Sequence, residues 1–173
     1  MNLSIIKQKT LRLTLLMFII LILSSCNVNN LNEVKINNAF VNEYNEAIKD
    51  YNKLAENFTE LARFMNKSLT DTDINTRFWK DYDKKRNDVV SSINHLNNFE
   101  FMYQENKLCM ENINPLINNV EKYLNKIDTF RRDNSDSYFE FNEQLKNLYN
   151  NILYQSNIVS STFDNIYEQY IVQ

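Results

Sequence analysis

The chain has 173 residues, of which 43% are hydrophobic and 13% aromatic, and a formal net charge of −3 at neutral pH. This length and apolar content fit one domain with a hydrophobic core. The sequence contains no glycine, which excludes glycine-built nucleotide loops and the nucleophile elbow of serine hydrolases, and disfavours an all-β fold with tight turns. Its single histidine, His95, excludes metal sites built from two or more histidines.

The N-terminal segment has the layout of a secretory signal. Three basic residues, Lys7, Lys9 and Arg12, precede an apolar run from Leu13 to Leu23, and no acidic residue occurs there. The run has 11 residues, whereas a helix needs about 20 to cross the hydrocarbon core of a bilayer. We therefore expect this segment to be cleaved rather than kept as a membrane anchor.

The end of this run, Leu23-Ser24-Ser25-Cys26, resembles the bacterial lipobox. The resemblance implies a diacylglyceryl group on the thiol of Cys26 and cleavage between Ser25 and Cys26. Two acyl chains hold a protein stably on a membrane, whereas one does so only marginally. The alternatives are an ordinary signal peptide, in which Cys26 is incidental, and an uncleaved anchor. The expected organisation is a signal peptide over 1–25, a lipidated cysteine and short tether over 26–32, and a helical bundle domain over 33–173.

The rest of the chain is rich in asparagine, isoleucine, lysine and tyrosine, and in this composition it is similar to small lipoproteins of low-GC Gram-positive bacteria. In a Gram-negative envelope, Asn27 after the cysteine would favour the outer membrane. Loss of residues 1–25 leaves 16 basic and 22 acidic side chains, a net charge of −6. This acidic balance argues against nucleic-acid binding. The two basic clusters, Lys84-Lys85-Arg86 and Arg131-Arg132, are interpreted as solvated helix faces.

Apolar residues recur at alternating steps of four and three, which indicates amphipathic helices with coiled-coil-like spacing. The first predicted helix covers about residues 31–69. Its core stripe comprises Phe40, Tyr44, Ala47, Tyr51, Leu54, Phe58, Leu61 and Met65. The cluster from Thr70 to Asp73 predicts a turn, because its side-chain oxygens can cap the start of a second helix.

Pro115 predicts the end of the second helix, since its ring clashes with a helical residue before it. The core columns of that helix are Tyr82, Val89, Leu96, Tyr103 and Met110. A short third helix over about 115–132 follows, with Leu116, Val120, Tyr123, Ile127 and Phe130 as its stripe. The alternative is that the two helices form one rod kinked at Pro115.

Ser137 and Glu140 have the spacing of a capping box, which predicts a last helix from Tyr138 to the end of the chain. Short connections between long helices favour antiparallel neighbours. The predicted fold class is therefore all-α, an elongated antiparallel bundle of three to four long helices.

No pattern in the sequence indicates catalysis, a cofactor or a metal site. Ser92 stands three residues before His95, so the Glu-x-x-His motif of di-iron bundles is absent, and His95 is expected at the core boundary. Cys109 is expected to be a partly buried, unreactive thiol, with pairing between chains as the alternative. Acidic pairs one turn apart are interpreted as solvated charge on outer faces. They are Glu43 with Glu46, Glu56 with Glu60, and Glu140 with Glu143.

The ten tyrosines are expected mainly in the core, with hydroxyls reaching water at the edge of the bundle. Three apolar residues, Phe101, Leu153 and Tyr167, do not fit the core stripes and form a possible contact surface. A local slip in register would instead bring Phe101 inward.

These observations predict a lipid-anchored protein on the extracytoplasmic face of a bacterial membrane, acting as a non-catalytic binding module. The expected partners are the membrane, through the anchor, and a protein or cell-wall polymer, with no nucleic acid. The oligomeric state is left open. One alternative is a structural or immunity lipoprotein that blocks a membrane partner, and a weaker one is an envelope hydrolase that uses carboxylates and tyrosines.

Overall fold

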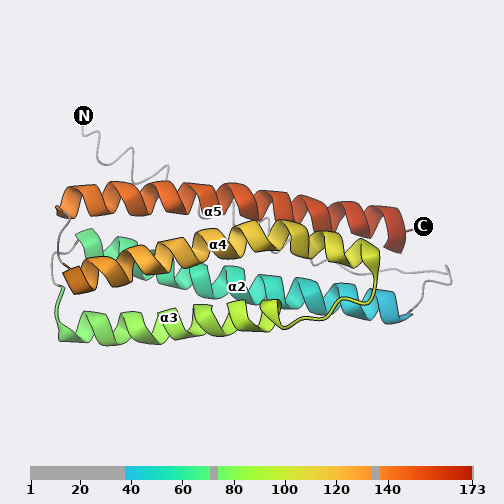
Figure 1. The fold of residues 1–173 in the computed structure, drawn as a ribbon, viewed down its shortest axis with the longest axis horizontal. Coiled ribbons are helices and arrows are strands. Elements are labelled where there is room, and N and C mark those ends of the chain that lie inside the picture. The colour runs from blue at the N-terminus through green and yellow to red at the C-terminus, as the bar shows by residue number, and fades with distance from the viewer. Residues whose placement is uncertain (1–37, 71–73, 134–136, 173) are drawn as a thin grey trace. The chain divides into compact units, whose positions relative to one another are not determined.

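The computed structural model describes residues 38–70, 74–133 and 137–172. Within these residues the chain folds into four α-helices and no strand, which confirms the predicted all-α bundle (Figure 1). The helices are α2 (Asn38–Thr70), α3 (Thr76–Asn97), α4 (Gln104–Asp133) and α5 (Tyr138–Ile166), followed by a π-helical segment, η1 (Tyr167–Ile171). The predicted signal peptide, Cys26, the tether and the first residues of the first predicted helix lie outside the described residues.

The predicted core stripe of the first helix is confirmed, because all eight of its side chains are buried in α2. The stripe predicted after Pro115 is also buried, and it forms the C-terminal part of α4. Residues three and four apart share one face of a helix, so a spacing of four and three turns an apolar sequence into a continuous core surface.

Helices α2 and α5 meet in antiparallel orientation, through side chains spaced seven residues apart on each helix. Seven residues are close to two helical turns, so every contact falls on the same face. We call this contact the α2–α5 seam. Its pairs are Tyr44 with Phe163, Tyr51 with Ser156, and Phe58 with Tyr149.

The predicted end point of the second helix is wrong. The helix stops at Asn97 rather than Asn114, and a connection over residues 98–103 leads into α4. The amide of Asn98 donates to the carbonyl of Asn94, and the amide of Phe99 to that of Leu96, which closes the last turn. Tyr103 and Met110, predicted as core columns, are half-buried beside this break, while Cys109 takes the fully buried position.

Pro115 lies inside α4, so neither a break nor a separate third helix occurs there. A proline within a helix leaves the carbonyl four residues earlier without its amide partner. That carbonyl belongs to Glu111, and both Glu111 and Pro115 are exposed, so water can solvate it. The penalty for the proline is therefore smaller here than on the buried face of the helix.

The helix starts are capped by side chains. The hydroxyl of Ser137 accepts from the amide of Glu140 while the Glu140 carboxylate accepts from the amide of Ser137, which confirms the predicted capping box. The cap of α3 is Asn75, whose side-chain oxygen accepts from the amide of Phe78 at 3.0 Å. The last helix was predicted to stay α-helical to the chain end, but its regular part stops at Ile166 and η1 follows.

Candidate binding surfaces

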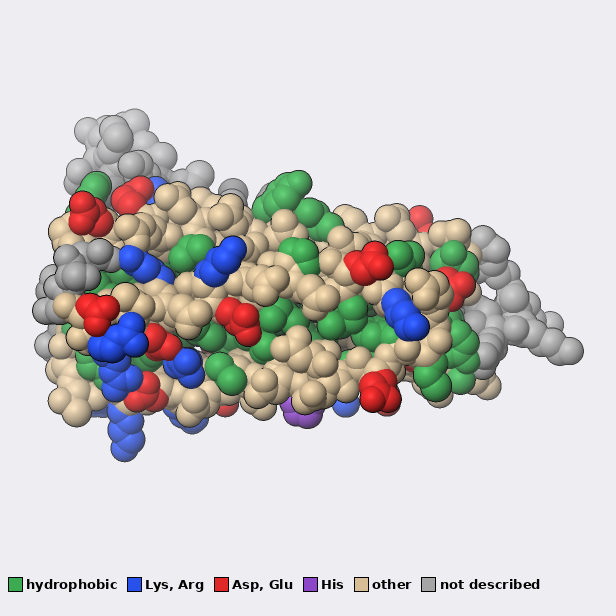
Figure 2. All heavy atoms as spheres, viewed as in Figure 1, with side chains coloured by type: hydrophobic (Ala, Val, Ile, Leu, Met, Phe, Trp, Pro, Cys, Tyr) green, Lys and Arg blue, Asp and Glu red, His purple; other side chains and the backbone are tan. Residues whose placement is uncertain are grey.

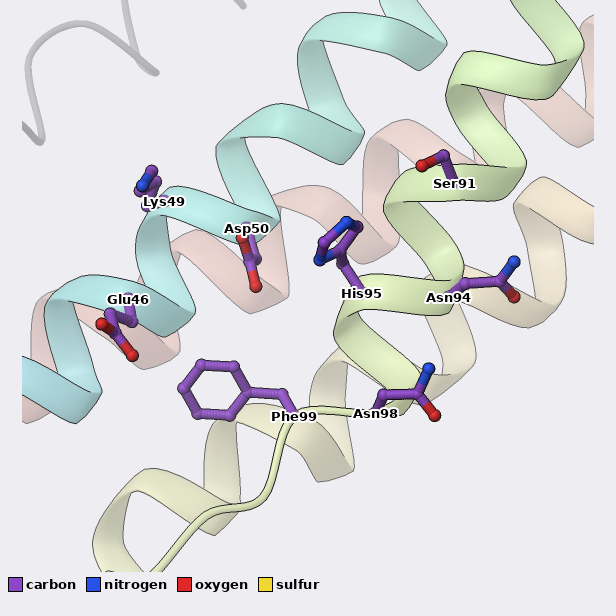
Figure 3. Close-up of a pocket in the computed structure, with 8 residues that line it drawn as sticks. All are labelled: Glu46, Lys49, Asp50, Ser91, Asn94, His95, Asn98 and Phe99. Carbon is purple, nitrogen blue, oxygen red and sulfur yellow. The ribbon is translucent and has the colours of Figure 1, made fainter.

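A shallow groove of about 550 Å³ lies between α2 and the C-terminal end of α3. Figure 3 shows Asp50 and His95 pointing into the space between the two helices, with the ring of Phe99 below them. His95 is exposed and the groove is open to solvent. Ligand pockets are usually enclosed and mainly apolar, so this groove has the character of a polar surface depression. The lining residues are Glu46, Lys49, Asp50, Ser91, Asn94, His95, Asn98 and Phe99.

A buried carboxylate joins α2 to the start of α4. Glu43 was expected on an outer face, but it is only 6% exposed. Its oxygens accept from the amides of Met102 at 2.7 Å and Tyr103 at 3.2 Å, and from the side-chain amide of Asn106 at 2.9 Å. A negative charge at the start of a helix satisfies free amides and opposes the positive end of the helix dipole. Glu43 thereby holds the connection in front of α4.

A signal for this buried position was present in the sequence. Glu43 lies three residues after Phe40 and four before Ala47, so it falls on the core stripe of its own helix. The other members of the predicted acidic pairs are exposed, as expected for solvated charge.

Two arginines of the basic clusters connect α3 to α4. Arg86 Nε lies 2.9 Å from Asp128 Oδ2, and Tyr82 Oη donates to Asp128 Oδ1 at 2.8 Å. Burial, together with the hydrogen bond to Asp128 and its charge, raises the pKa of Tyr82 above its usual range. Burial alone would lower the pKa of Arg86, but its interactions with Asp128 outweigh burial and raise it.

A second pair extends this contact toward the end of α4. Arg131 binds both oxygens of Asp83, at 2.6 and 3.3 Å, and its guanidinium lies 4.9 Å from the centre of the Trp79 ring. We call the two ion pairs and Tyr82 the α3–α4 seam. The expectation of wholly solvated basic faces missed these contacts, because the acidic partners lie more than forty residues away in the sequence.

Cys109 is fully buried in α4. Burial raises the pKa of its thiol to about 12. Only the thiolate reacts readily with oxidants and alkylating reagents, so Cys109 is chemically protected in the folded chain.

The three apolar residues of the predicted contact surface are all half-buried. Phe101 lies in the connection before α4, where its ring is 4.5 Å from that of Phe99. Tyr167 lies in η1 and stacks on Tyr44, with ring centres 6.4 Å apart. Both pack against the core. Leu153 lies in the middle of α5, about 21 Å along the helix axis from Tyr167 at 1.5 Å per residue.

The outer side of α5 carries a surface that the sequence interpretation did not identify. No charged residue occurs between Lys146 and Asp164, and Tyr154 in this stretch is 65% exposed. Figure 2 shows hydrophobic side chains standing among uncharged atoms along the middle of α5. We call the exposed residues of this stretch the α5 outer face. They are Asn147, Asn150, Asn151, Tyr154, Asn157 and Ser161.

The exposed side of α2 has a different composition. It carries acidic and basic side chains intermixed, namely Glu46, Lys49, Lys53, Glu56, Glu60 and Arg63. Protein interfaces are depleted of charged residues and enriched in tyrosine, and asparagine and serine supply adaptable hydrogen bonds in antibody contact surfaces. By these criteria the α5 outer face is the best candidate for contact with another macromolecule.

In the part of the chain that the structure describes, no helix has both the length and the hydropathy to cross a bilayer. The same residues contain no group of three or more His, Cys, Asp or Glu side chains placed to hold a metal ion. No protein-family model, curated protein or solved structure matches the chain.

Proposed function

We propose that this protein is a lipid-anchored, non-catalytic binding module on the extracytoplasmic face of a bacterial membrane. The α5 outer face is the observation that carries the binding role, because it combines an exposed tyrosine with uncharged hydrogen-bonding side chains over about 25 Å of helix. The apolar run that ends in Leu23-Ser24-Ser25-Cys26 supports the location.

Burial of Cys109 gives a direct test of the anchor. The chain has two cysteines, and the thiol of Cys109 is inaccessible in the folded protein. Labelling of the native protein with a maleimide therefore reports on Cys26 alone. We expect no label on the native protein from bacterial membranes, one label on Cys109 after denaturation, and an intact mass that corresponds to a diacylglyceryl chain starting at residue 26.

The matched control is Cys26→Ser, which we expect to lose the lipid, keep the signal segment and shift in fractionation. A full-length wild-type chain with one thiol that reacts under native conditions would contradict the anchor. The binding role is tested by crosslinking in cells with wild type and Tyr154→Asp. If the crosslinked products are identical for the two proteins, the α5 outer face is not the binding surface.

A further inference from the structure

We propose that the α5 outer face binds the same face of a second copy of this chain, with the two α5 helices antiparallel and Tyr154 near the centre of the contact. This inference rests on the proposed binding role of the face and names its partner.

The charge distribution favours a second copy. The chain without residues 1–25 carries a net charge of −6, so two anchored copies repel each other over most of their surfaces. In a symmetric dimer the same patch of both copies forms the interface, so every charged residue of the patch occurs twice in it. A charge that is buried there without a partner is strongly unfavourable. Residues 147–163 form the longest uncharged stretch in the four described helices. The copies can therefore meet on this stretch without burying a charge.

The arrangement of residues along the face suits a two-fold axis. Tyr154 lies close to the midpoint of the uncharged stretch, with three exposed asparagines before it and Asn157 and Ser161 after it. An axis at Tyr154 places Asn150 opposite Asn157 of the second copy, and Asn147 opposite Ser161. An asparagine amide both donates and accepts, so the facing amides can pair, and the two tyrosine rings can contact each other at the axis.

The charged residues that bound the stretch select the antiparallel orientation. Lys146 and Asp164 are 18 residues apart, which is five helical turns, so they lie on the same side of α5. An antiparallel pair brings Lys146 of each copy toward Asp164 of the other, whereas a parallel pair would place like charges together. Two acidic residues lie beyond these charges. Glu143 Oε1 is 3.5 Å from Lys146 Nζ. Glu168 lies near Asp164, and its charge adds to burial in raising the pKa of Asp164. These acidic ends confine the contact to the uncharged stretch.

The size of the face indicates a weak dimer. A helix face about 25 Å long and about 10 Å wide covers a few hundred Å², whereas stable complexes bury about 800 Å² on each partner. Two copies anchored in one membrane have a much higher effective concentration than in dilute solution. The dimer is therefore expected on the membrane and largely dissociated in extracts.

The test is crosslinking of the full-length protein in intact cells with a short bis-maleimide. Tyr154→Cys places its new thiol at the proposed axis, while two copies of Asn150→Cys hold their thiols about 12 Å apart along the helix. Asn118→Cys, at an exposed asparagine of α4, is the matched control. Labelling with a monofunctional maleimide verifies that each new thiol is accessible, and the buried Cys109 does not interfere.

We expect at least ten times more crosslinked dimer for Tyr154→Cys than for Asn118→Cys. Coexpressed Asn150→Cys and Asn157→Cys should crosslink to each other more than either does to itself. Equal self-crosslinking at 150 and 157 would indicate parallel helices and overturn the proposal. A dimer yield at 154 no higher than at 118 would do the same.

Two other crosslinked products would also contradict the proposal that a second copy of the chain binds the α5 outer face. A link from position 154 to a different protein would keep the binding role and reject self-association, and an intramolecular link to Cys26 would show that the N-terminal segment covers the face. The intact mass of the chain decides the acylation of Cys26 independently, so failure of the anchor and failure of the dimer are distinguishable.

Discussion

The α2–α5 seam is built from aromatic rings and tyrosine hydroxyls, whereas the α3–α4 seam adds to the buried Tyr82 two ion pairs whose charged side chains are about one third exposed or more. Tyr44 Oη donates to the carbonyl of Phe163 at 2.8 Å, and Tyr51 Oη lies 2.6 Å from Ser156 Oγ. In the other seam, Arg86 and Asp128 are 33% and 32% exposed. Both seams join helices that are antiparallel, yet their surroundings differ in polarity.

This difference sets how much each seam contributes to stability. A buried hydrogen bond lies in a medium of low polarity, and its loss leaves an unsatisfied group, so it responds strongly to substitution and little to salt. A part-exposed ion pair is screened by water and ions and contributes about 0–1 kcal/mol. The α2–α5 seam also joins residues 91 to 119 positions apart, so it closes the bundle.

The largest contrast is expected between an aromatic residue of one seam and an arginine of the other. Phe58 is 5% exposed, and its ring centre lies 5.2 Å from that of Tyr123. Phe58→Ala leaves a cavity and should lower the free energy of unfolding by about 3–5 kcal/mol. Arg131→Ala removes a part-exposed ion pair and a cation–π contact and should lower it by about 1 kcal/mol. Urea unfolding followed by circular dichroism measures both, and equal losses would contradict the comparison.

Alkaline pH should weaken both seams next, because each contains at least one tyrosine with a raised pKa, which is Tyr82 in the α3–α4 seam. Burial raises the pKa of Tyr51 and of Tyr149 above the ordinary value of 10.0. A group whose pKa is raised by folding contributes stability that is complete below its unfolded pKa and is lost as the pH rises through its folded pKa. Above about pH 10, these tyrosines lose their protons in the unfolded chain but keep them in the folded chain. For each of them, the free energy of unfolding should therefore fall by up to about 1.4 kcal/mol per pH unit.

Cys109 should cause a loss of stability that begins at a lower pH, near 9. Burial raises the pKa of its thiol from an ordinary value of 9.0 to about 12. Urea midpoints from pH 8 to 11 should fall, and Cys109→Ala should remove the part that begins near pH 9. The part above pH 10 should persist in that variant and shrink in Tyr149→Phe. Stability that stays constant to pH 11 would show that these groups ionise in the folded chain as easily as in water.

Loss of a single buried hydroxyl should have an intermediate effect. Tyr51→Phe removes the bonds from Tyr51 Oη to the hydroxyl and carbonyl of Ser156. Removing one such contact should lower the free energy of unfolding by about 0.5–1.5 kcal/mol. Tyr154→Phe, on the α5 outer face, is the matched control and should leave the stability of the monomer unchanged. A double-mutant cycle with Ser156→Ala measures the coupling, and a coupling of zero would place the stabilisation elsewhere.

The sequence predicted the core of α2 well, because one uninterrupted spacing fixes which face of a helix is apolar. It failed around residues 98–103, where the end of α3 has neither a proline nor a glycine. Pro115 is the strongest local signal for a break, yet it lies on the exposed side of α4, where a missing amide bond matters least. The break forms instead where the buried Glu43, distant in sequence, supplies bonds to the amides of Met102 and Tyr103.

The exposed residues of the α5 outer face could not be identified from the sequence, for a different reason. The uncharged stretch 147–163 was visible in the sequence, but only the packed bundle shows which of its side chains remain outside. Tyr149 and Tyr154 are both tyrosines of this stretch, and one stacks on Phe58 in the core while the other is 65% exposed. Composition alone cannot separate these two roles, because the packing of α4 and α2 against α5 decides which of its faces is covered.

The smallest expected effect belongs to the α3–α4 seam and tests its dependence on charge. Asp128→Asn removes the ion pair with Arg86 but retains an oxygen that can accept from Tyr82. The free energy of unfolding should fall by less than about 1 kcal/mol in dilute buffer. The difference from wild type should shrink further in 1 M salt, where charges are screened within about 3 Å. Because the bonds of the α2–α5 seam are between neutral groups, the effect of Tyr51→Phe should keep its size in the same salt. If Asp128→Asn were as destabilising in 1 M salt as in dilute buffer, the α3–α4 seam would depend on buried hydrogen bonds in the same way as the α2–α5 seam.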